Sequence, residues 1–187
     1  MESKLAIIIN GRGGVGKDTL CDYFIKCYPA RKFSSIEPVK KIARACKWEG
    51  GKEEKDRKFL SDLKCLLSDY NDLPFNACIS AYLNFLDSDK SIWFVMVREP
   101  DEIEKLKRTI QDKLGGRCAT LLIRRPDVEK TWGNMADDNV DDYHYDYIFD
   151  NYPPIEAAQY DFVCLVREIE RETYGNIKES LKDDLES

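Results

Sequence analysis

A glycine-rich stretch that ends in a lysine is the part of the chain whose residue types most clearly predict chemistry. It consists of Gly11, Arg12, Gly13, Gly14, Val15, Gly16, Lys17, Asp18 and Thr19, and it matches the pattern G-x-x-x-x-G-K. Glycines let the backbone curl so that successive N–H groups point at one anion. Lys17 is then expected to reach the outer phosphates of a nucleoside triphosphate. These nine residues therefore predict an ATP-binding loop.

The segments on either side of the loop are those that a phosphate-binding loop needs. Leu5 to Asn10 is almost continuously apolar, as in a parallel strand buried on both faces. A helix is expected from Leu20 to Tyr28, because Pro29 cannot continue it. Its positive end would add to the field of the loop. Strand, loop and helix in this order favour phosphate binding over the alternative, a glycine-rich turn with a solvated lysine.

The residue that follows the lysine differs from the general pattern. Asp18 stands where Ser or Thr usually acts as a magnesium ligand. A carboxylate also ligates Mg²⁺, directly or through water, so Asp18 is the predicted metal ligand. Thr19 is expected to hydrogen-bond an inner phosphate.

Strand and helix patterns alternate along the rest of the chain. Apolar, β-branched and aromatic runs predict strands over 91–97, 118–123 and 147–149, and residues 31–35 form either a short strand or the entry to a loop. Apolar residues at helical spacing predict helices from Glu37, over 55–70, 74–86 and 100–114, and after Pro154. The helix over 55–70 is expected to bury a stripe made of Phe59, Leu60, Leu63, Leu66 and Leu67.

This alternation is typical of an α/β fold around a parallel sheet, and we expect one domain over residues 1–187. The polar segment 124–143 is long for a loop in a compact domain and is predicted to be a lid.

Composition argues against several classes of protein. The chain has 187 residues, of which 43% are hydrophobic, enough for a globular domain with a core. A net charge of -6 argues against broad attraction to nucleic acid, and no apolar run is long enough for a membrane. Seven cysteines without a C-x-x-C pair, and one histidine, argue against a zinc site. Scattered free thiols favour a reducing, cytoplasmic location.

Three further segments stand in a characteristic order after the loop. They are Phe33 to Ala43, which contains Pro38 and Lys40; Met96-Val97-Arg98, which is followed by Pro100 and Glu102; and Tyr145 to Asn151, which is acidic and aromatic. With the Gly16-Lys17-Asp18 motif they resemble the deoxynucleoside monophosphate kinase family of P-loop phosphotransferases. The phosphomevalonate kinases of animals belong to the same broader group. The match covers about residues 4–45 and 91–165.

The resemblance implies a three-layer P-loop NTPase fold with five parallel strands in the order 2-3-1-4-5. ATP would occupy the loop, and the acceptor would lie between the loop and the helices of residues 36–90. The implied function is transfer of the γ-phosphoryl group of ATP to a nucleoside or deoxynucleoside monophosphate or similar small acceptor. The implied cofactors are ATP and Mg²⁺, and the protein is expected to be a monomer or a homodimer that binds neither nucleic acid nor membrane.

One departure from the family favours an alternative function. The family places an aspartate that helps to hold magnesium where this chain has Met96. Asp18 would then hold the metal with waters, or with help from Glu99 or an acid of the 137–142 segment. The alternative is a nucleotide-binding regulatory domain with weak or no kinase activity. A GTP- or ATP-hydrolysing switch is disfavoured, because the chain has no N-K-x-D motif.

Several basic residues are candidates for phosphate contacts. Arg98 is the first candidate for gripping an acceptor phosphate, and the alternative is a structural salt bridge to a carboxylate such as Glu102. Arg124 and Arg125 begin the predicted lid and either stabilise charge on the transferring phosphoryl or lie in solvent before Pro126.

Four more residues complete the predicted site. Lys40 and Arg44 lie one helical turn apart and either line the acceptor cleft or form a solvated helix face. Asn151 and Tyr152 follow the last strand, where the fold usually meets the adenine. Tyr152 either stacks on the base or packs as a turn residue.

Overall fold

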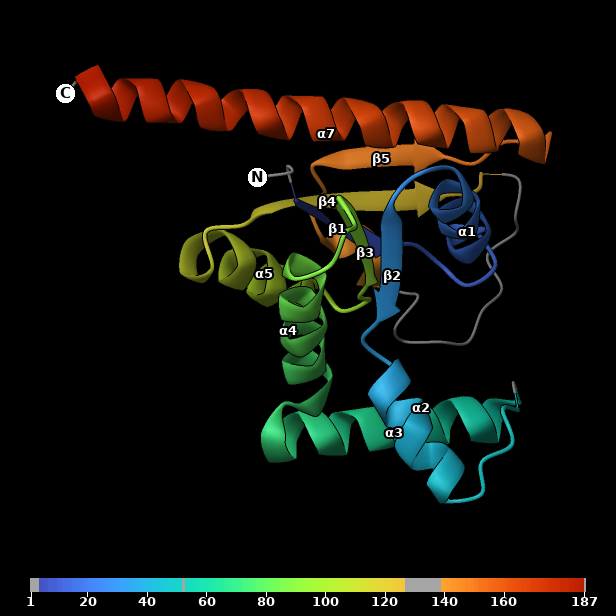
Figure 1. Ribbon diagram of the computed structural model, residues 1–187. Helices are drawn as coiled ribbons and strands as arrows, with labels where there is room; N and C mark the ends of the chain where they lie inside the picture. Colours follow the sequence, from blue (N-terminus) through green and yellow to red (C-terminus); the bar gives the residue numbers. More distant parts are fainter. Residues whose placement is uncertain (1–3, 52, 127–138, 187) are drawn as a thin grey trace.

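The structure is a computed structural model that describes residues 4–51, 53–126 and 139–186, with 176–186 as backbone only (Figure 1). Within these residues a sheet of five parallel strands runs through the protein in the order β2-β3-β1-β4-β5. The strands are β1 (Leu5–Asn10), β2 (Ala30–Ser34), β3 (Ile92–Met96), β4 (Arg117–Arg124) and β5 (Tyr147–Asp150). The predicted α/β class and strand order are confirmed.

The central strand β1 is buried on both faces, as its apolar sequence predicted. Because side chains alternate along a strand, Ile7 and Ile9 face one layer while Ala6 and Ile8 face the other. The first layer holds α1 (Lys17–Cys27) and α7 (Ile155–Glu186). The second holds α4 (Leu73–Leu86) and α5 (Pro100–Arg108). The sheet is thus covered by helices on both sides (Figure 1).

Two helices lie away from the sheet. Figure 1 shows α2 (Glu37–Ala45) and α3 (Glu54–Asn71) at the opposite end of the molecule from α7, with α4 running between them and the sheet. The main contacts of α3 are with α2 and α4. Together α2, α3 and α4 occupy the region 36–90 in which the sequence predicted acceptor binding.

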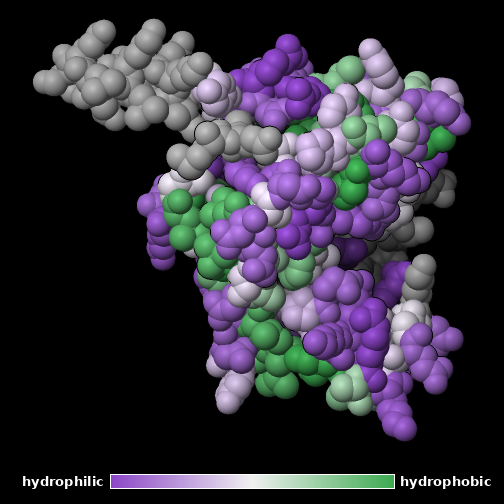
Figure 2. Space-filling view, viewed as in Figure 1, coloured by the Kyte–Doolittle hydropathy of each residue, from purple (hydrophilic) through white to green (hydrophobic). Residues whose placement is uncertain are grey.

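The predicted apolar stripe of α3 is wrong in part. Leu60, Leu63 and Leu67 are half-buried, but Phe59 is 38% exposed and Leu66 is 64% exposed. Hydrophobic surface accordingly gathers at this end of the molecule (Figure 2). The physical reason is that α3 packs on two other helices rather than on the sheet, so little of its circumference is covered. The one residue of α3 that is buried is Lys64.

Other predicted boundaries differ by small amounts. Helix α1 begins at Lys17, so the helix starts at the loop lysine itself rather than at Leu20. The helix predicted over 100–114 is α5 followed by a π-helical turn, Thr109–Lys113. Most of the predicted lid, residues 127–138, lies outside the described residues, and a 3-10 turn at Asn139–Asp142 follows it.

All seven cysteines are free thiols, in agreement with the sequence prediction. In the part of the chain that the structure describes, no helix is long and apolar enough to cross a membrane.

Candidate functional site

The glycine-rich loop connects the end of β1 to the start of α1, at the carboxyl edge of the sheet. Gly11 has φ +148, and a Cβ added there would lie 2.3 Å from the carbonyl oxygen of Ile123. Gly16 has φ +93, and a Cβ there would lie 2.6 Å from Nδ2 of Asn151. At both positions a side chain is excluded by conformation and by space. The loop is therefore held closely against the ends of β4 and β5.

Asn151 braces this loop from the far end of the chain. Its side-chain Nδ2 donates to the carbonyl oxygen of Val15 at 2.7 Å, and its backbone N–H donates to the carbonyl oxygen of Arg124 at 2.7 Å. The residue is buried. Asn151 was predicted to contact the adenine, whereas its side-chain amide is bonded to the loop backbone. Tyr152, the next residue, is 51% exposed.

The loop lysine lies over the loop. Lys17 donates from Nζ to the carbonyl oxygen of Gly11 and, at 2.7 Å, to that of Arg12. Helix α1 begins at the same place, with the positive end of the helix directed at the loop. An ammonium group and a helix N-terminus thus meet at one curled backbone segment, which is the arrangement that binds phosphate.

The predicted metal ligand, Asp18, is an exposed carboxylate in the first turn of α1. Lys32 of β2 places its Nζ 2.9 Å from this carboxylate and 2.8 Å from that of Asp22. Burial would lower the pKa of Lys32, but its hydrogen bonds to Asp22 and Asp18 outweigh burial and raise it. An exposed carboxylate with room for water suits Mg²⁺, so Asp18 fits the predicted role. The half-buried side chain of Met96 offers no oxygen.

Within residues 4–51, 53–126 and 139–186, no group of three or more His, Cys, Asp or Glu side chains is placed to hold a metal ion. Glu99, an alternative ligand from the sequence, forms an ion pair with Lys64.

A buried asparagine at the end of β1 connects the loop to its surroundings. Asn10 accepts a hydrogen bond from the N–H of Gly11 at 2.8 Å. Its Nδ2 donates to the carbonyl oxygen of Arg98 at 2.8 Å and to the hydroxyl of Tyr145 at 2.7 Å. That hydroxyl donates to the carbonyl oxygen of Val140 at 3.0 Å. Asn10 was not among the predicted site residues, although a polar residue that ends an otherwise apolar strand was the available signal.

The hydrogen bond from Asn10 holds the backbone of one predicted site residue, Arg98. Arg98 follows β3, is half-buried, and lies at the same sheet edge as the loop, because β1 and β3 are paired neighbours. Arg12, within the loop, pairs with Asp141 at 2.7 Å, so the loop is also joined to the turn that follows the 127–138 segment.

The remaining predicted residues lie on the surface. Lys40 pairs with Glu37 of its own helix at 3.1 Å, and Arg44 is exposed. Arg124, the last residue of β4, pairs with Asp150 of β5 at 3.3 Å. Arg125 is exposed. The roles predicted for these four basic residues stay predictions.

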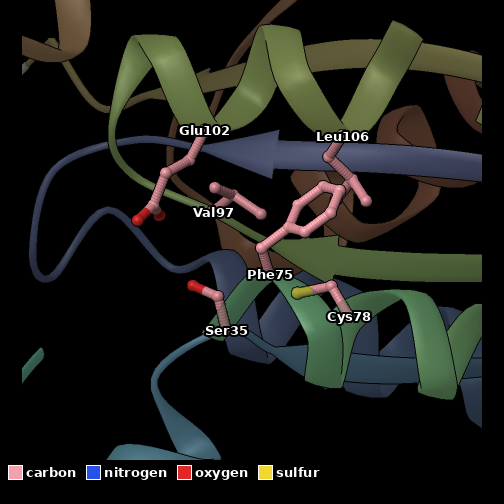
Figure 3. Close-up of a pocket in the computed structure, with 6 residues that line it drawn as sticks. All are labelled: Ser35, Phe75, Cys78, Val97, Glu102 and Leu106. Carbon is pink, nitrogen blue, oxygen red and sulfur yellow. The ribbon is translucent and has the colours of Figure 1, made fainter. Parts of the chain in front are cut away.

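A pocket opens between α4, α5 and the ends of β2 and β3, and Figure 3 shows its six lining residues. It is small, with room for about one water molecule. Ser35, Phe75, Cys78, Val97, Glu102 and Leu106 line it. The N–H of Val97 donates to the carbonyl oxygen of Ile9, so the pocket wall is attached to the strand that leads into the loop. None of these six residues was a predicted acceptor contact.

Two carboxylates beside this pocket share one ammonium group. Lys64 of α3 forms ion pairs with Glu99, which precedes α5, and with Glu102 of α5, the latter at 2.8 Å. Burial, with the neighbouring Glu99 charge adding to it, raises the pKa of Glu102 to about 7 against the opposing effect of Lys64. Burial acts on Glu99 in the same sense, but the Lys64 ammonium and a hydrogen bond with Glu102 outweigh it and lower the pKa of Glu99.

The fold is shared with a solved structure. The tunicamycin resistance protein of Deinococcus radiodurans is similar with a TM-score of 0.54 and 13% identity over 88% of this chain and 95% of that one. A gluconokinase of Sinorhizobium meliloti 1021 gives a TM-score of 0.47 and 12% identity over 94% and 97% of the two chains. An APS kinase of Mycobacterium tuberculosis gives a TM-score of 0.46 and 11% identity over 89% of this chain and 99% of that one. No family model and no curated protein matches the chain.

At these identities the similarity concerns the fold alone, a parallel five-stranded sheet in the order β2-β3-β1-β4-β5 with helices on both faces.

Proposed function

We propose that this chain is an ATP-dependent phosphotransferase that moves the γ-phosphoryl group of ATP to a small acceptor, a nucleoside or deoxynucleoside monophosphate or a similar molecule. The observation that carries the proposal is the loop between β1 and α1, where Gly11 and Gly16 leave no room for a side chain and Lys17 lies over the curled backbone. Transfer of a phosphoryl group needs mainly positioning and positive charge, and this loop supplies both for the donor.

The other site residues receive roles from their places at the same sheet edge or, for Lys40 and Arg44, on α2. Lys17 and the loop N–H groups hold the β- and γ-phosphates, and Asp18 holds Mg²⁺, which neutralises charge on these phosphates when bound. Arg98 would bind the acceptor phosphate, and its position after β3, beside the strand that leads into the loop, supports this role. Arg124 and Arg125 precede the predicted lid and would stabilise charge on the transferring group, while Lys40 and Arg44 would line the outer part of the acceptor region.

A second candidate function rests on one residue. Met96 provides no oxygen ligand at the position where the resembled family has an aspartate, which favours a nucleotide-binding regulatory domain with little or no kinase activity. Both candidates bind ATP, and only the first transfers phosphate. We also keep the cytoplasmic location and the monomeric or homodimeric state as parts of the proposal.

The first experiment tests nucleotide binding. A ligand that binds only the folded state raises the melting temperature, so millimolar ATP with Mg²⁺ should stabilise the wild type. Lys17→Ala should lose most of this shift, and Lys26→Ala, at an exposed lysine in the last turn of α1, should keep it. An equal shift in Lys17→Ala and wild type, or no shift in either, would contradict the proposal.

The second experiment separates kinase from binder. Labelled ATP is incubated with a panel of nucleoside and deoxynucleoside monophosphates, and labelled diphosphate products are counted. Product from at least one acceptor supports the kinase. Stabilisation by ATP without any product supports the regulatory domain.

A further inference from the structure

We infer that Asp141 competes with the nucleotide for the loop: its carboxylate holds the guanidinium of Arg12 until the phosphate oxygens of a triphosphate replace it. Arg12 then acts as a phosphate-binding side chain. The inference rests on the proposed function, which brings a triphosphate to the glycine-rich loop but does not say which side chains must first leave another partner.

The guanidinium of Arg12 belongs to the glycine-rich loop itself. The residue lies between Gly11 and Gly13, at the start of the loop. Its Nη2 lies 2.7 Å from Oδ2 of Asp141, so the two side chains form an ion pair with a charge-assisted hydrogen bond. A guanidinium binds a carboxylate and a phosphate with the same N–H groups. The Asp141 carboxylate and an incoming phosphate are therefore alternative partners for one side chain.

A buried chain of hydrogen bonds holds the backbone of Asp141 beside the loop. Asp141 follows Val140 in the 3-10 turn Asn139–Asp142. The carbonyl oxygen of Val140 accepts from the hydroxyl of Tyr145 at 3.0 Å, and this hydroxyl accepts from Nδ2 of Asn10 at 2.7 Å. Val140, Tyr145 and Asn10 are all buried. The turn that carries Asp141 is thus attached to the end of the strand that leads into the loop.

The loop lysine is also bound by oxygen atoms of the protein. Lys17 donates from Nζ to the carbonyl oxygens of Gly11 and Arg12, the latter at 2.7 Å. A triphosphate offers oxygen atoms to both basic side chains of the loop. The carbonyl oxygens that hold Lys17 carry only partial charges, whereas the carboxylate that holds Arg12 carries a full negative charge. Asp141 is therefore the stronger of the two competitors.

The exposure of the ion pair limits the size of the effect. The side chains of Arg12 and Asp141 are 33% and 58% exposed, so water screens their attraction. A ligand that needs a contact to open first has its affinity reduced by the fraction of molecules in which that contact is open. The carboxylate also repels a phosphate that approaches the loop. Together these effects should weaken triphosphate binding about three- to fivefold.

The test measures affinities by titration calorimetry with inorganic tripolyphosphate, ATP with Mg²⁺ and ATP with EDTA as probes. Asp141→Asn keeps the shape of the side chain and removes its charge. This variant should bind each probe about three- to fivefold more tightly than the wild type, and the gain should shrink at high ionic strength. Removal of a residue that only supported the loop would weaken binding, so the sign of the change distinguishes competition from support.

Two comparisons show whether the gain acts through Arg12. Asp142→Asn, at the exposed next residue of the same turn, removes the same charge and should change each affinity less than about twofold. Arg12→Ala should weaken tripolyphosphate binding about fivefold or more. In the Arg12→Ala background, Asp141→Asn should change the affinity no more than Asp142→Asn does, as a double-mutant cycle measures. Melting temperatures are measured for every variant, and both carboxylates are exposed, so we expect all variants to fold.

The outcomes separate this inference from the proposed function. If the affinities change as expected but labelled ATP transfers phosphate to no acceptor, the kinase proposal fails and the competition stands. If phosphate is transferred but Asp141→Asn binds no more tightly than the wild type, the inference fails alone. An equal gain in Asp142→Asn, or an undiminished gain in the Arg12→Ala background, would also overturn it, because general repulsion would then explain the result.

Two further results would contradict the inference. A loss of affinity in Asp141→Asn that is confined to ATP with Mg²⁺ would assign this carboxylate to the metal ion instead of to Arg12. A wild type that binds none of the probes at millimolar concentration would overturn both the inference and the proposed function.

Discussion

The side chain of Asn151 donates a hydrogen bond to the carbonyl oxygen of Val15 at 2.7 Å, so the residue after the last strand holds the middle of the glycine-rich loop. The same nitrogen is the atom that a Cβ on Gly16 would meet at 2.6 Å. The loop conformation therefore depends both on residues within the loop and on Asn151.

Replacing Asn151 should loosen the loop. Asn151→Ala removes a buried donor and leaves the Val15 carbonyl unpaired, which should lower the free energy of unfolding by about 1–3 kcal/mol. It should also reduce the rise in melting temperature caused by ATP. Urea denaturation and thermal melts measure the two effects. Tyr152→Ala, at the exposed neighbour, should change stability by less than about 0.5 kcal/mol, and equal losses in both variants would contradict the role of Asn151.

Two glycines of the loop should respond differently to alanine. Gly14 and Gly16 both have positive φ, at +80 and +93, but only Gly16 has an atom within 4 Å of the added Cβ. Gly16→Ala should therefore destabilise the protein more than Gly14→Ala, whose cost is the backbone strain of about 1 kcal/mol. The difference should shrink when the Asn151→Ala substitution is also present, as a double-mutant cycle measures. A difference of the same size with and without Asn151→Ala would show that the contact is unimportant.

The hydroxyl of Tyr145 should contribute to stability through Asn10. Tyr145→Phe leaves the Val140 carbonyl without this donor and Asn10 without this acceptor, both in a buried position. We expect a loss of about 1–3 kcal/mol in the free energy of unfolding, measured by urea denaturation. Tyr70→Phe, at a tyrosine that is largely exposed, serves as the control and should have almost no effect.

The acidic pair beside the pocket should make stability depend on pH. In the folded protein the pKa of Glu102 is raised from 4.5 to about 7, so the folded state binds this proton more tightly than the unfolded state. Stability should therefore fall as the pH rises between these two values and then level off. Glu99, whose pKa is lowered, acts in the opposite direction and only below its ordinary range.

Glu102→Gln should remove this pH dependence. The remaining Lys64 and Glu99 form a balanced pair, so the variant should gain about 1–3 kcal/mol relative to wild type between about pH 5 and about pH 8. Melting curves at both pH values give the difference, and Asp101→Asn should show no such gain. A wild type whose stability rises over this interval, with no change in Glu102→Gln, would contradict the assignment.

Much of the fold was predictable because local signals and the fold agreed. The apolar run of β1, the β-branched and aromatic run of β3 and the Gly16-Lys17 motif each describe a short segment, and each lies where the sequence placed it. The strand order came from the resemblance to a known family. The exposure of Phe59 and Leu66 was not predictable from spacing, since it depends on which helices cover α3.

The glycine-rich loop was predictable from the sequence, whereas the charged cluster around Lys64 was not. The loop is one continuous stretch, whereas the charged cluster joins Lys64 to Glu99 and Glu102 from two separate helices. One local signal existed. Lys64 lies between Leu60 and Leu67 on the half-buried face of α3, where a charge requires a partner. The partner itself could not be named without the tertiary structure.

The contact between Asn151 and Val15 also determines how late in translation the glycine-rich loop can be braced. The two residues are 136 positions apart, and β5 must be in place before Asn151 can reach the loop. A nascent chain on the ribosome therefore carries an unbraced loop through most of its translation. Any affinity for anions that depends on this brace is acquired only when the edge strand β5 has joined the sheet. A bound anion therefore cannot assist the earlier steps of co-translational folding by way of the braced loop.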